Sequence, residues 1–210
     1  MQNIYLILHP KKQNTPCMKK LILSTLVSLI STHSLFAQEK YPISIKNSKV
    51  KWIGEKVTGA HYGYVNLKDA YFLFEEDKLV GGEFNMDMNS ITCTDIEDEK
   101  YATKLVDHLK NDDFFATDKY PISNFKITKV IFDGTSYMIT GDMTIRDITQ
   151  EITFPAKFHS HGSISHANAS IKIDRTKHDI KYGSGSFFDD LGDRMIYNEF
   201  TLKVKLELRK

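Results

Sequence analysis

The stretch Gly81-Gly82-Glu83-Phe84-Asn85-Met86-Asp87-Met88-Asn89 alternates apolar and polar side chains. Phe84, Met86 and Met88 share one face, and the residues between them share the other. A period of two is typical of a strand with one face buried and the other in water. We therefore predict a strand whose Phe84, Met86 and Met88 point into the protein interior.

The residues that follow change from a strand pattern to a helix pattern. Thr94 and Glu97 have the spacing of a capping box, in which two side chains satisfy free N–H groups at a helix start. An apolar stripe then recurs every four residues, at Tyr101, Leu105 and Leu109. We predict a helix from about Asp95 to Lys110 that covers one end of a β-structure with this stripe facing inward.

Aromatic residues continue beyond the helix. Phe114 and Phe115 follow a polar turn, and a second strand runs through Phe125. Most other segments of the chain alternate in the same way, which gives about eight strands and one substantial helix. A single helix cannot cover two sheet faces, so the sheet must close on itself or form a sandwich. We predict an all-β fold, an extended antiparallel eight-stranded barrel with one inserted helix.

Residues 1–37 have the composition of an upstream extension and a secretory signal peptide. A basic start at Met18-Lys19-Lys20 precedes the apolar segment Leu21–Ile30, which is too short to span a membrane. Ala37 offers a small residue at a cleavage site. We predict cleavage after Ala37, one domain over residues 38–210, and a periplasmic or secreted location.

Charge and cysteine content exclude some classes of protein. The sequence has 28 Lys and Arg against 27 Asp and Glu, and residues 1–37 contain lysines but no acid. The predicted mature chain is therefore slightly acidic and has no basic field for nucleic acid. Cys93 is its one cysteine, so it has no internal disulfide. A homodimer remains open.

The histidine residues and their possible acidic partners do not stand at a spacing that indicates a catalytic site. His61, His108 and the group His159, His161 and His166 have no role that the sequence defines. His159 and His161 could face one side of a strand as a zinc pair, but no further ligand stands at the required spacing, and a polar hairpin end is the better interpretation. We predict no catalytic residue, no metal and no cofactor.

The chain is instead rich in apolar and aromatic side chains that would converge inside one barrel. Such side chains are the usual lining of small-molecule sites. The pattern alone leaves a ligand cavity and a filled core equally open.

Several motifs resemble the YceI-like family. Its central signature is similar to His108-Leu109-Lys110, Asp113-Phe114-Phe115, Tyr120-Pro121 and Phe125. Further similar motifs are Val50-x-Trp52-x-Gly54, Gly82-x-Phe84, Gly141-Asp142-Met143-Thr144-Ile145 and Ile173-Asp174-Arg175. His178 departs from the family, in which an aromatic residue commonly stands at that position.

The resemblance implies a lipocalin-like barrel that holds a polyisoprenoid, an isoprenoid quinone or a similar long lipid in an apolar tunnel, for carriage or sequestration. The side chains we expect at the ligand are Trp52, Phe72, Phe74, Phe84, Met86, Met88, Leu105, Leu109, Phe114, Phe115, Phe125, Met143 and Arg175. Arg175 could meet an anionic head group, although pairing with Asp174 or Asp179 is favoured. The alternatives are an enzyme acting on such a lipid through His61, His108 or Asp174-Arg175, and a structural β-module.

Overall fold

The structure is a computed structural model that describes residues 37–161 and 164–209. The predicted signal peptide lies outside these residues, apart from Ala37. The strands are β1 Glu39–Pro42, β2 Lys49–Lys56, β3 Gly59–Glu75, β4 Lys78–Asp87, β5 Ile122–Phe132, β6 Tyr137–Ile145, β7 Ile148–His161, β8 Ile164–Asp174 and β9 Ile196–Arg209. The α-helix is α1 Glu99–Lys110, and short 3-10 helices are η1 Ile45–Asn47, η2 Met88–Ser90, η3 Arg175–His178 and η4 Gly192–Arg194.

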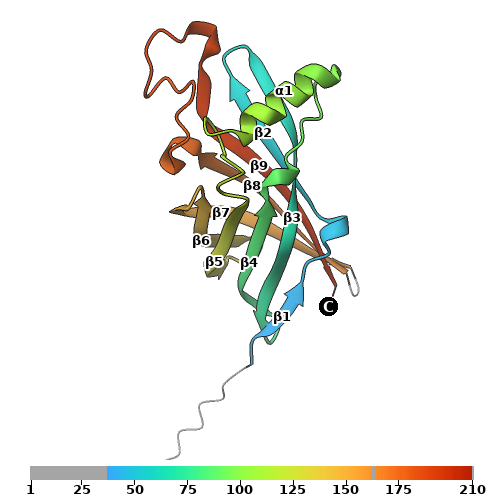
Figure 1. The fold of residues 1–210 in the computed structure, drawn as a ribbon. Helices are drawn as coiled ribbons and strands as arrows, with labels where there is room; N and C mark the ends of the chain where they lie inside the picture. The colour runs from blue at the N-terminus through green and yellow to red at the C-terminus, as the bar shows by residue number, and fades with distance from the viewer. Residues whose placement is uncertain (1–36, 162–163, 210) are drawn as a thin grey trace, which may run out of the picture. The chain divides into compact units, whose positions relative to one another are not determined.

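The sheet is antiparallel and closes on itself (Figure 1). Its order is β1-β3-β2-β9-β8-β7-β6-β5-β4, and a further pairing of β3 with β4 completes the ring. The predicted eight-stranded barrel is confirmed as β2 to β9. The extra strand β1 pairs with β3 beyond the end of β2, so β1 and β2 follow one another along the same edge of β3.

The predicted facing of β4 is confirmed. Phe84 and Met86 on β4, and Met88 in η2, are buried at the barrel interior. The side chains of Glu83 and Asn85, which alternate with them along the strand, point outward and accept hydrogen bonds from Asn124 Nδ2 at 3.1 and 2.7 Å. The period-two pattern of apolar residues therefore indicated which face of this strand is buried.

The predicted start of the helix is wrong. The helix α1 begins at Glu99, and its N-cap is Asp98, whose carboxylate accepts hydrogen bonds from the N–H groups of Lys100 and Tyr101. The N–H of Thr94 instead donates to the carbonyl oxygen of Tyr62 on β3, at 2.9 Å. A hydrogen bond from Thr94 to a residue distant in the sequence is therefore formed instead of the capping box that the local spacing favours.

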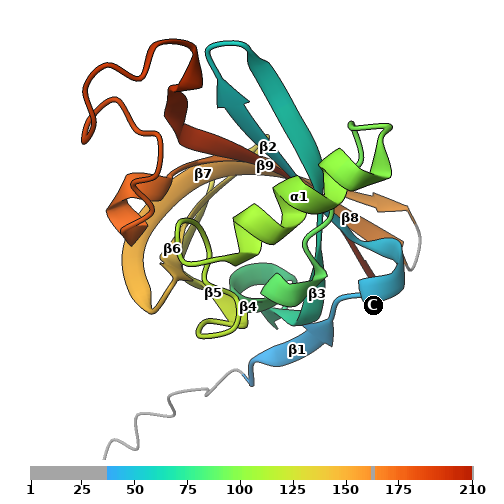
Figure 2. The ribbon, with the colours of Figure 1, turned by 45° about the horizontal axis from the view of Figure 1, so that its top comes forward.

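The helix α1 crosses one end of the barrel, as the view onto that end shows (Figure 2). Exposure changes along its predicted stripe: Tyr101 is 63% exposed, Leu105 is half-buried and Leu109 is 9% exposed. Side chains four residues apart drift around a helix of 3.6 residues per turn, so a stripe at this interval rotates away from one contact surface. The expectation that Tyr101 faces into the barrel is therefore wrong.

Candidate functional site

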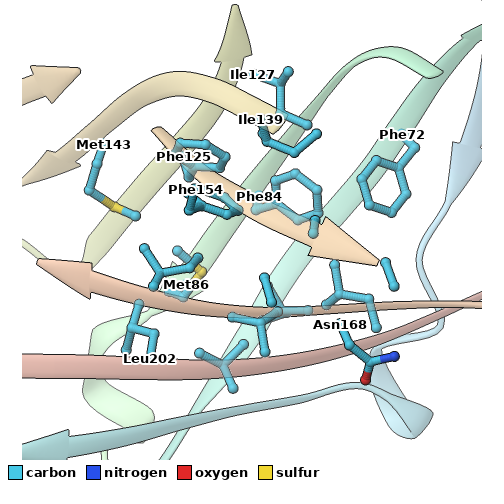
Figure 3. A pocket seen from close by; sticks show the side chains of 18 of the residues that line it. Phe72, Phe84, Met86, Phe125, Ile127, Ile139, Met143, Phe154, Asn168 and Leu202 are labelled. Carbon is cyan, nitrogen blue, oxygen red and sulfur yellow. The ribbon is translucent and has the colours of Figure 1, made fainter. Parts of the chain in front are cut away.

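The barrel interior contains two adjoining apolar cavities. The first, the inner chamber, has a volume of about 70 Å³ and lies among β2 to β9 (Figure 3). Five predicted site residues line it: Phe72, Phe84, Met86, Phe125 and Met143. Aromatic rings meet edge-on or tilted around it, with the centroids of Phe72 and Phe84 at 5.2 Å and those of Phe125 and Phe154 at 5.4 Å.

Small side chains leave the space for the inner chamber. Ala156 on β7 lies directly opposite Ala169 on β8, and both line the chamber. Ala167, two residues before Ala169, lies opposite Phe158 and also lines it. Neighbouring inward positions that carry only methyl groups cannot fill the space between the large rings. The alternation of β8 indicated that Ala167 and Ala169 share one face, but only the strand register shows that Ala169 lies opposite Ala156.

The second cavity, the mouth chamber, lies beneath α1 and has a volume of about 100 Å³. Eight predicted site residues line it: Trp52, Met86, Met88, Leu109, Phe114, Phe115, Met143 and Arg175. The ring of Phe115 packs edge-on against Phe200 of β9, with centroids 6.2 Å apart. The indole Nε1–H of Trp52 donates to the carbonyl oxygen of Thr92 at 2.9 Å, so its one polar group is satisfied.

The two chambers meet at Met86, Met143 and Leu202, which line both. Each chamber is smaller than the ~300–1,000 Å³ typical of drug-sized ligand sites. A long chain could therefore occupy the barrel only if side chains at this junction move. Methionine side chains are flexible and suited to such a change, because they are unbranched and rotate about three bonds.

Two predicted ligand residues line neither chamber. Phe74 is buried near the opposite end of β3, where its ring packs edge-on against Tyr41 of β1 with centroids 5.4 Å apart. Leu105 packs against the core from the flank of α1, and on its other side it lines an open hollow between α1 and β3. Both side chains support the chamber walls without facing the cavities.

Arg175 is held by backbone carbonyl oxygens and not by Asp174 or Asp179, the partners that the sequence favoured. Its guanidinium group is buried and donates to the carbonyl oxygens of Ile180 at 2.8 Å, Ile196 at 3.1 Å and Tyr197 at 3.1 Å. Burial lowers the pKa of Arg175, and the charge of Asp174 partly offsets this effect. An arginine remains protonated even so. A buried cation therefore holds the backbone beside the mouth chamber.

Residues 90–95, here called the edge segment, connect η2 to the approach of α1 along the free edge of β3. The N–H of Thr92 donates to the carbonyl oxygen of Tyr64 at 2.9 Å, and its hydroxyl oxygen accepts from the N–H of Tyr64 at 3.2 Å. A Cβ at Gly63 would lie 1.8 Å from the carbonyl oxygen of Thr92, so only glycine permits this approach. The edge segment thereby pairs the part of β3 that β4 leaves uncovered.

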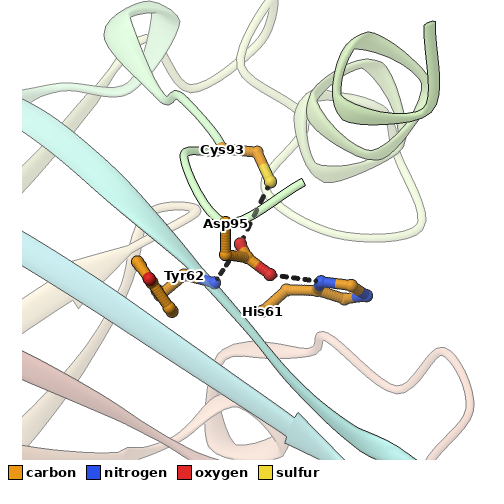
Figure 4. Close-up of polar contacts among 4 residues, drawn as sticks. All are labelled: His61, Tyr62, Cys93 and Asp95. Carbon is orange, nitrogen blue, oxygen red and sulfur yellow. Dashed lines mark hydrogen bonds and ion pairs between the residues drawn. The ribbon is translucent and has the colours of Figure 1, made fainter. Parts of the chain in front are cut away.

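The edge segment ends at a cluster of polar side chains (Figure 4). One oxygen of Asp95 accepts from the N–H of Tyr62 at 2.8 Å and from the thiol of Cys93 at 3.3 Å, while the other lies 2.8 Å from His61 Nδ1. Burial raises the pKa of Asp95, but these hydrogen bonds outweigh it and keep the pKa below its ordinary value. Burial and the hydrogen bond to Asp95 raise the pKa of Cys93, which disfavours a nucleophilic thiolate.

The other candidate catalytic groups are also occupied by structural contacts. His108 Nε2 lies 3.1 Å from Asp113 Oδ2, and its ring is wedged edge-on against Phe114 and Tyr182. The carboxylate of Asp174 accepts from the N–H and hydroxyl of Thr176. None of these three groups, His61, His108 and Asp174, lines either chamber.

His159 on β7 and His166 on β8 lie on the outer face of the barrel. His159 stands directly opposite His166, and the side chain of His161 lies outside the described residues. Within the described part of the chain, no three His, Cys, Asp or Glu side chains gather closely enough to hold a metal ion. Over the same residues, no helix is long and apolar enough to cross a membrane.

Comparisons with known proteins agree with this architecture. "Protein YceI" of Shigella flexneri is 33% identical over 103 residues, which cover 48% of this chain and 50% of that protein. The chain thus spans about half the length of the curated relatives it matches. The crystal structure of Burkholderia cenocepacia BcnA aligns with a TM-score of 0.61 at 20% identity, covering 79% of this chain and 98% of that one.

A second solved structure is a polyisoprenoid binding domain from Saccharophagus degradans, implicated in plant cell wall breakdown. It aligns with a TM-score of 0.58 at 11% identity, covering 80% of this chain and 97% of that one. At such identities both solved structures support the fold alone. The model of the YceI-like domain matches residues 36–208, which include both chambers and α1. With this match over most of its length, the chain belongs to the YceI-like family.

Proposed function

We propose that the protein binds a polyisoprenoid, an isoprenoid quinone or a similar long amphiphile inside the barrel, and carries or sequesters it without catalysis. The observation that supports this proposal is a pair of adjoining chambers walled mainly by apolar side chains. Covering ~400 Å² of an isoprenoid chain contributes on the order of 10 kcal/mol before the costs of binding. Apolar burial alone can therefore hold such a ligand.

Mass spectrometry after solvent extraction of the purified protein tests the proposal. We expect a co-purifying long-chain lipid in the wild type. Ala167→Phe would fill the inner chamber, so this variant should retain shorter chains or less lipid per protein. Ser170→Phe is the matched control, because Ser170 is exposed on the same strand and faces outward. Equal lipid content in both variants would place the ligand outside the inner chamber, and no lipid in the wild type would favour a structural module.

An enzyme acting on an isoprenoid is the alternative from another class. The contacts of His61, His108 and Asp174 with structural partners make this alternative weaker. Incubating the protein with a prenyl alcohol or prenyl diphosphate and following turnover separates the two functions. Product formation above the rate without protein would favour the enzyme.

Export is part of the same proposal. A carrier of water-insoluble lipid is most useful in an aqueous compartment between membranes, and the composition of residues 18–37 favours secretion. N-terminal sequencing of the exported protein should begin at or near Gln38. An exported protein that still carries Met18 would contradict cleavage.

A further inference from the structure

The barrel wall is irregular between β2 and β9. Their ladder is regular from Lys49 opposite Lys205 to Gly54 opposite Phe200, and the next pair is Lys56 opposite Ile196. Glu55 alone therefore faces the three residues between Ile196 and Phe200. A bulge of this kind leaves backbone groups unpaired and bends the strand.

The same part of β9 also has no partner strand on its other side. The strand β8 ends at Asp174, opposite Glu199, so residues 196–198 have no β8 partner. Arg175, the next residue after β8, donates instead to the carbonyl oxygens of Ile196 and Tyr197. The guanidinium group of Arg175 thus binds carbonyl oxygens that a neighbouring strand would otherwise bind. With the hydrogen bond to the carbonyl oxygen of Ile180, each of its three nitrogens donates to a carbonyl oxygen.

The mouth chamber adjoins an outer hollow at this bulge. The hollow has a volume of about 410 Å³ and is bordered by the loop before β9, including Gly185 and Ser186. Four residues line both the chamber and the hollow: Glu55, Ile196, Tyr197 and Glu199. In Figure 2 this wall lies where β9 and the loop leading into it, drawn in red, stand beside β2. These four residues therefore form the wall that separates the mouth chamber from the outer hollow.

The charged side chains that line the outer hollow are carboxylates, and Lys56 stands at the end of the bulge, opposite Ile196. Glu55 and Glu199 are both exposed and stand on the two strands that border the bulge. Lys172 Nζ lies 3.1 Å from Glu199, but both side chains of this pair are more than half exposed, so water and salt weaken it. The charge of Arg175 is buried behind the wall and directed at backbone oxygens. The charged side chains that border the outer hollow are therefore those of Glu55 and Glu199.

We propose that this bulge is a side port through which the polar end of a bound lipid leaves the barrel. Glu55 and Glu199 make the port accept neutral or cationic ends and disfavour phosphorylated ones. The inference rests on the proposed function and adds the chemical class of the ligand's polar end. It also disfavours the anionic head group that the sequence left open as a partner of Arg175.

The test uses probes that share one hydrocarbon chain: geranylgeraniol, geranylgeranylamine and geranylgeranyl diphosphate. Their affinities for the delipidated full chain are measured at low and high salt. We expect the wild type to bind the amine about three- to tenfold more tightly than the diphosphate at low salt, with a smaller ratio at high salt. The double variant Glu55→Gln/Glu199→Gln should bring the ratio of the two affinities close to one.

The matched control is Glu97→Gln/Glu151→Gln, which removes two exposed carboxylates away from the port and changes the net charge equally. An amine preference that persists in the port variant, or that the control variant loses equally, would overturn the port. Tighter binding of the diphosphate by the wild type would overturn it as well, without any variant. Failure of all three probes to bind would overturn the proposed function and the port together, whereas binding of the alcohol without charge preference would overturn the port alone.

Discussion

Asp95 Oδ2 lies 2.8 Å from His61 Nδ1 and thereby joins the segment before α1 to β3. The other oxygen of Asp95 accepts from the N–H of Tyr62, so one side chain satisfies groups from two neighbouring residues of β3. The Asp95 side chain is only 13% exposed. The position of α1 over the mouth chamber therefore depends on this carboxylate.

Asp95→Asn should lower the free energy of unfolding at pH 7 by about 1–3 kcal/mol, because it removes the charge from a shielded set of hydrogen bonds. The folded-state pKa of Asp95 is depressed, so its contribution is present above the ordinary value of ~3.9 and is lost as the pH falls through the folded pKa. Urea titrations at pH 7 and between pH 5 and 3 measure both effects. Asp118→Asn, an exposed acid after α1, is the control, and equal losses in the two variants would contradict the role of Asp95.

The sequence alone could predict the barrel and most of its inner face. Phe84, Met86 and Met88 had to face inward, because a strand with one polar face can bury only the other. The start of α1 could not be predicted, because Thr94 binds β3 instead of capping the helix. Local spacing says nothing about such a distant partner.

The candidate site was predictable in composition but not in shape. Aromatic residues such as Phe125 were expected inside the barrel and line the inner chamber, whereas the space itself depends on Ala156 lying opposite Ala169 on the neighbouring strand. Strand register is a relation between segments, so no pattern within one segment reveals it. For the same reason, the carbonyl partners of Arg175 come from an irregular part of β9 that alternation does not show.

Phe84→Asp should cost several kcal/mol in the free energy of unfolding, because it places a carboxylate without a partner in the inner chamber. Lys157→Asp, which puts the same group on the exposed face of β7, should change the stability little. Denaturant titrations of the two variants beside the wild type make the comparison. Similar losses would mean that the assigned facing of β4 is wrong.

Phe115→Ala should lower the amount of retained lipid, because it removes a ring that lines the mouth chamber and packs against Phe200. Leu105→Ala should destabilise the protein by only ~1–2 kcal/mol, below the usual cost for a fully buried leucine, and should change lipid retention less. Lipid per protein by mass spectrometry and unfolding by urea give the two readouts. Greater lipid loss from Leu105→Ala than from Phe115→Ala would contradict the assignment of the mouth chamber.

Proton binding at His178 should lower the free energy of unfolding in mild acid. Its ring is 1% exposed, and Nδ1 donates to the carbonyl oxygen of Ile148 at 3.0 Å. Burial lowers the pKa of His178, and hydrogen bonds to the backbone at Ile148 and Ile145 offset this only in part. The folded state therefore favours the neutral ring. Stability is complete above the unfolded pKa of ~6.5 and falls as the pH drops from there towards the lower folded pKa, because the unfolded chain binds a proton first.

His178→Phe should remove this part of the pH dependence between pH 7 and pH 5, since a phenyl ring has no proton to bind. It also gives up the hydrogen bond to Ile148, so the comparison concerns the slope of stability against pH and not its value at one pH. Urea titrations at half-unit steps of pH supply that slope. His159→Gln, which removes an exposed histidine on β7, should leave the slope nearly as in the wild type. If His178→Phe keeps the wild-type slope, the loss of stability in acid originates elsewhere in the chain.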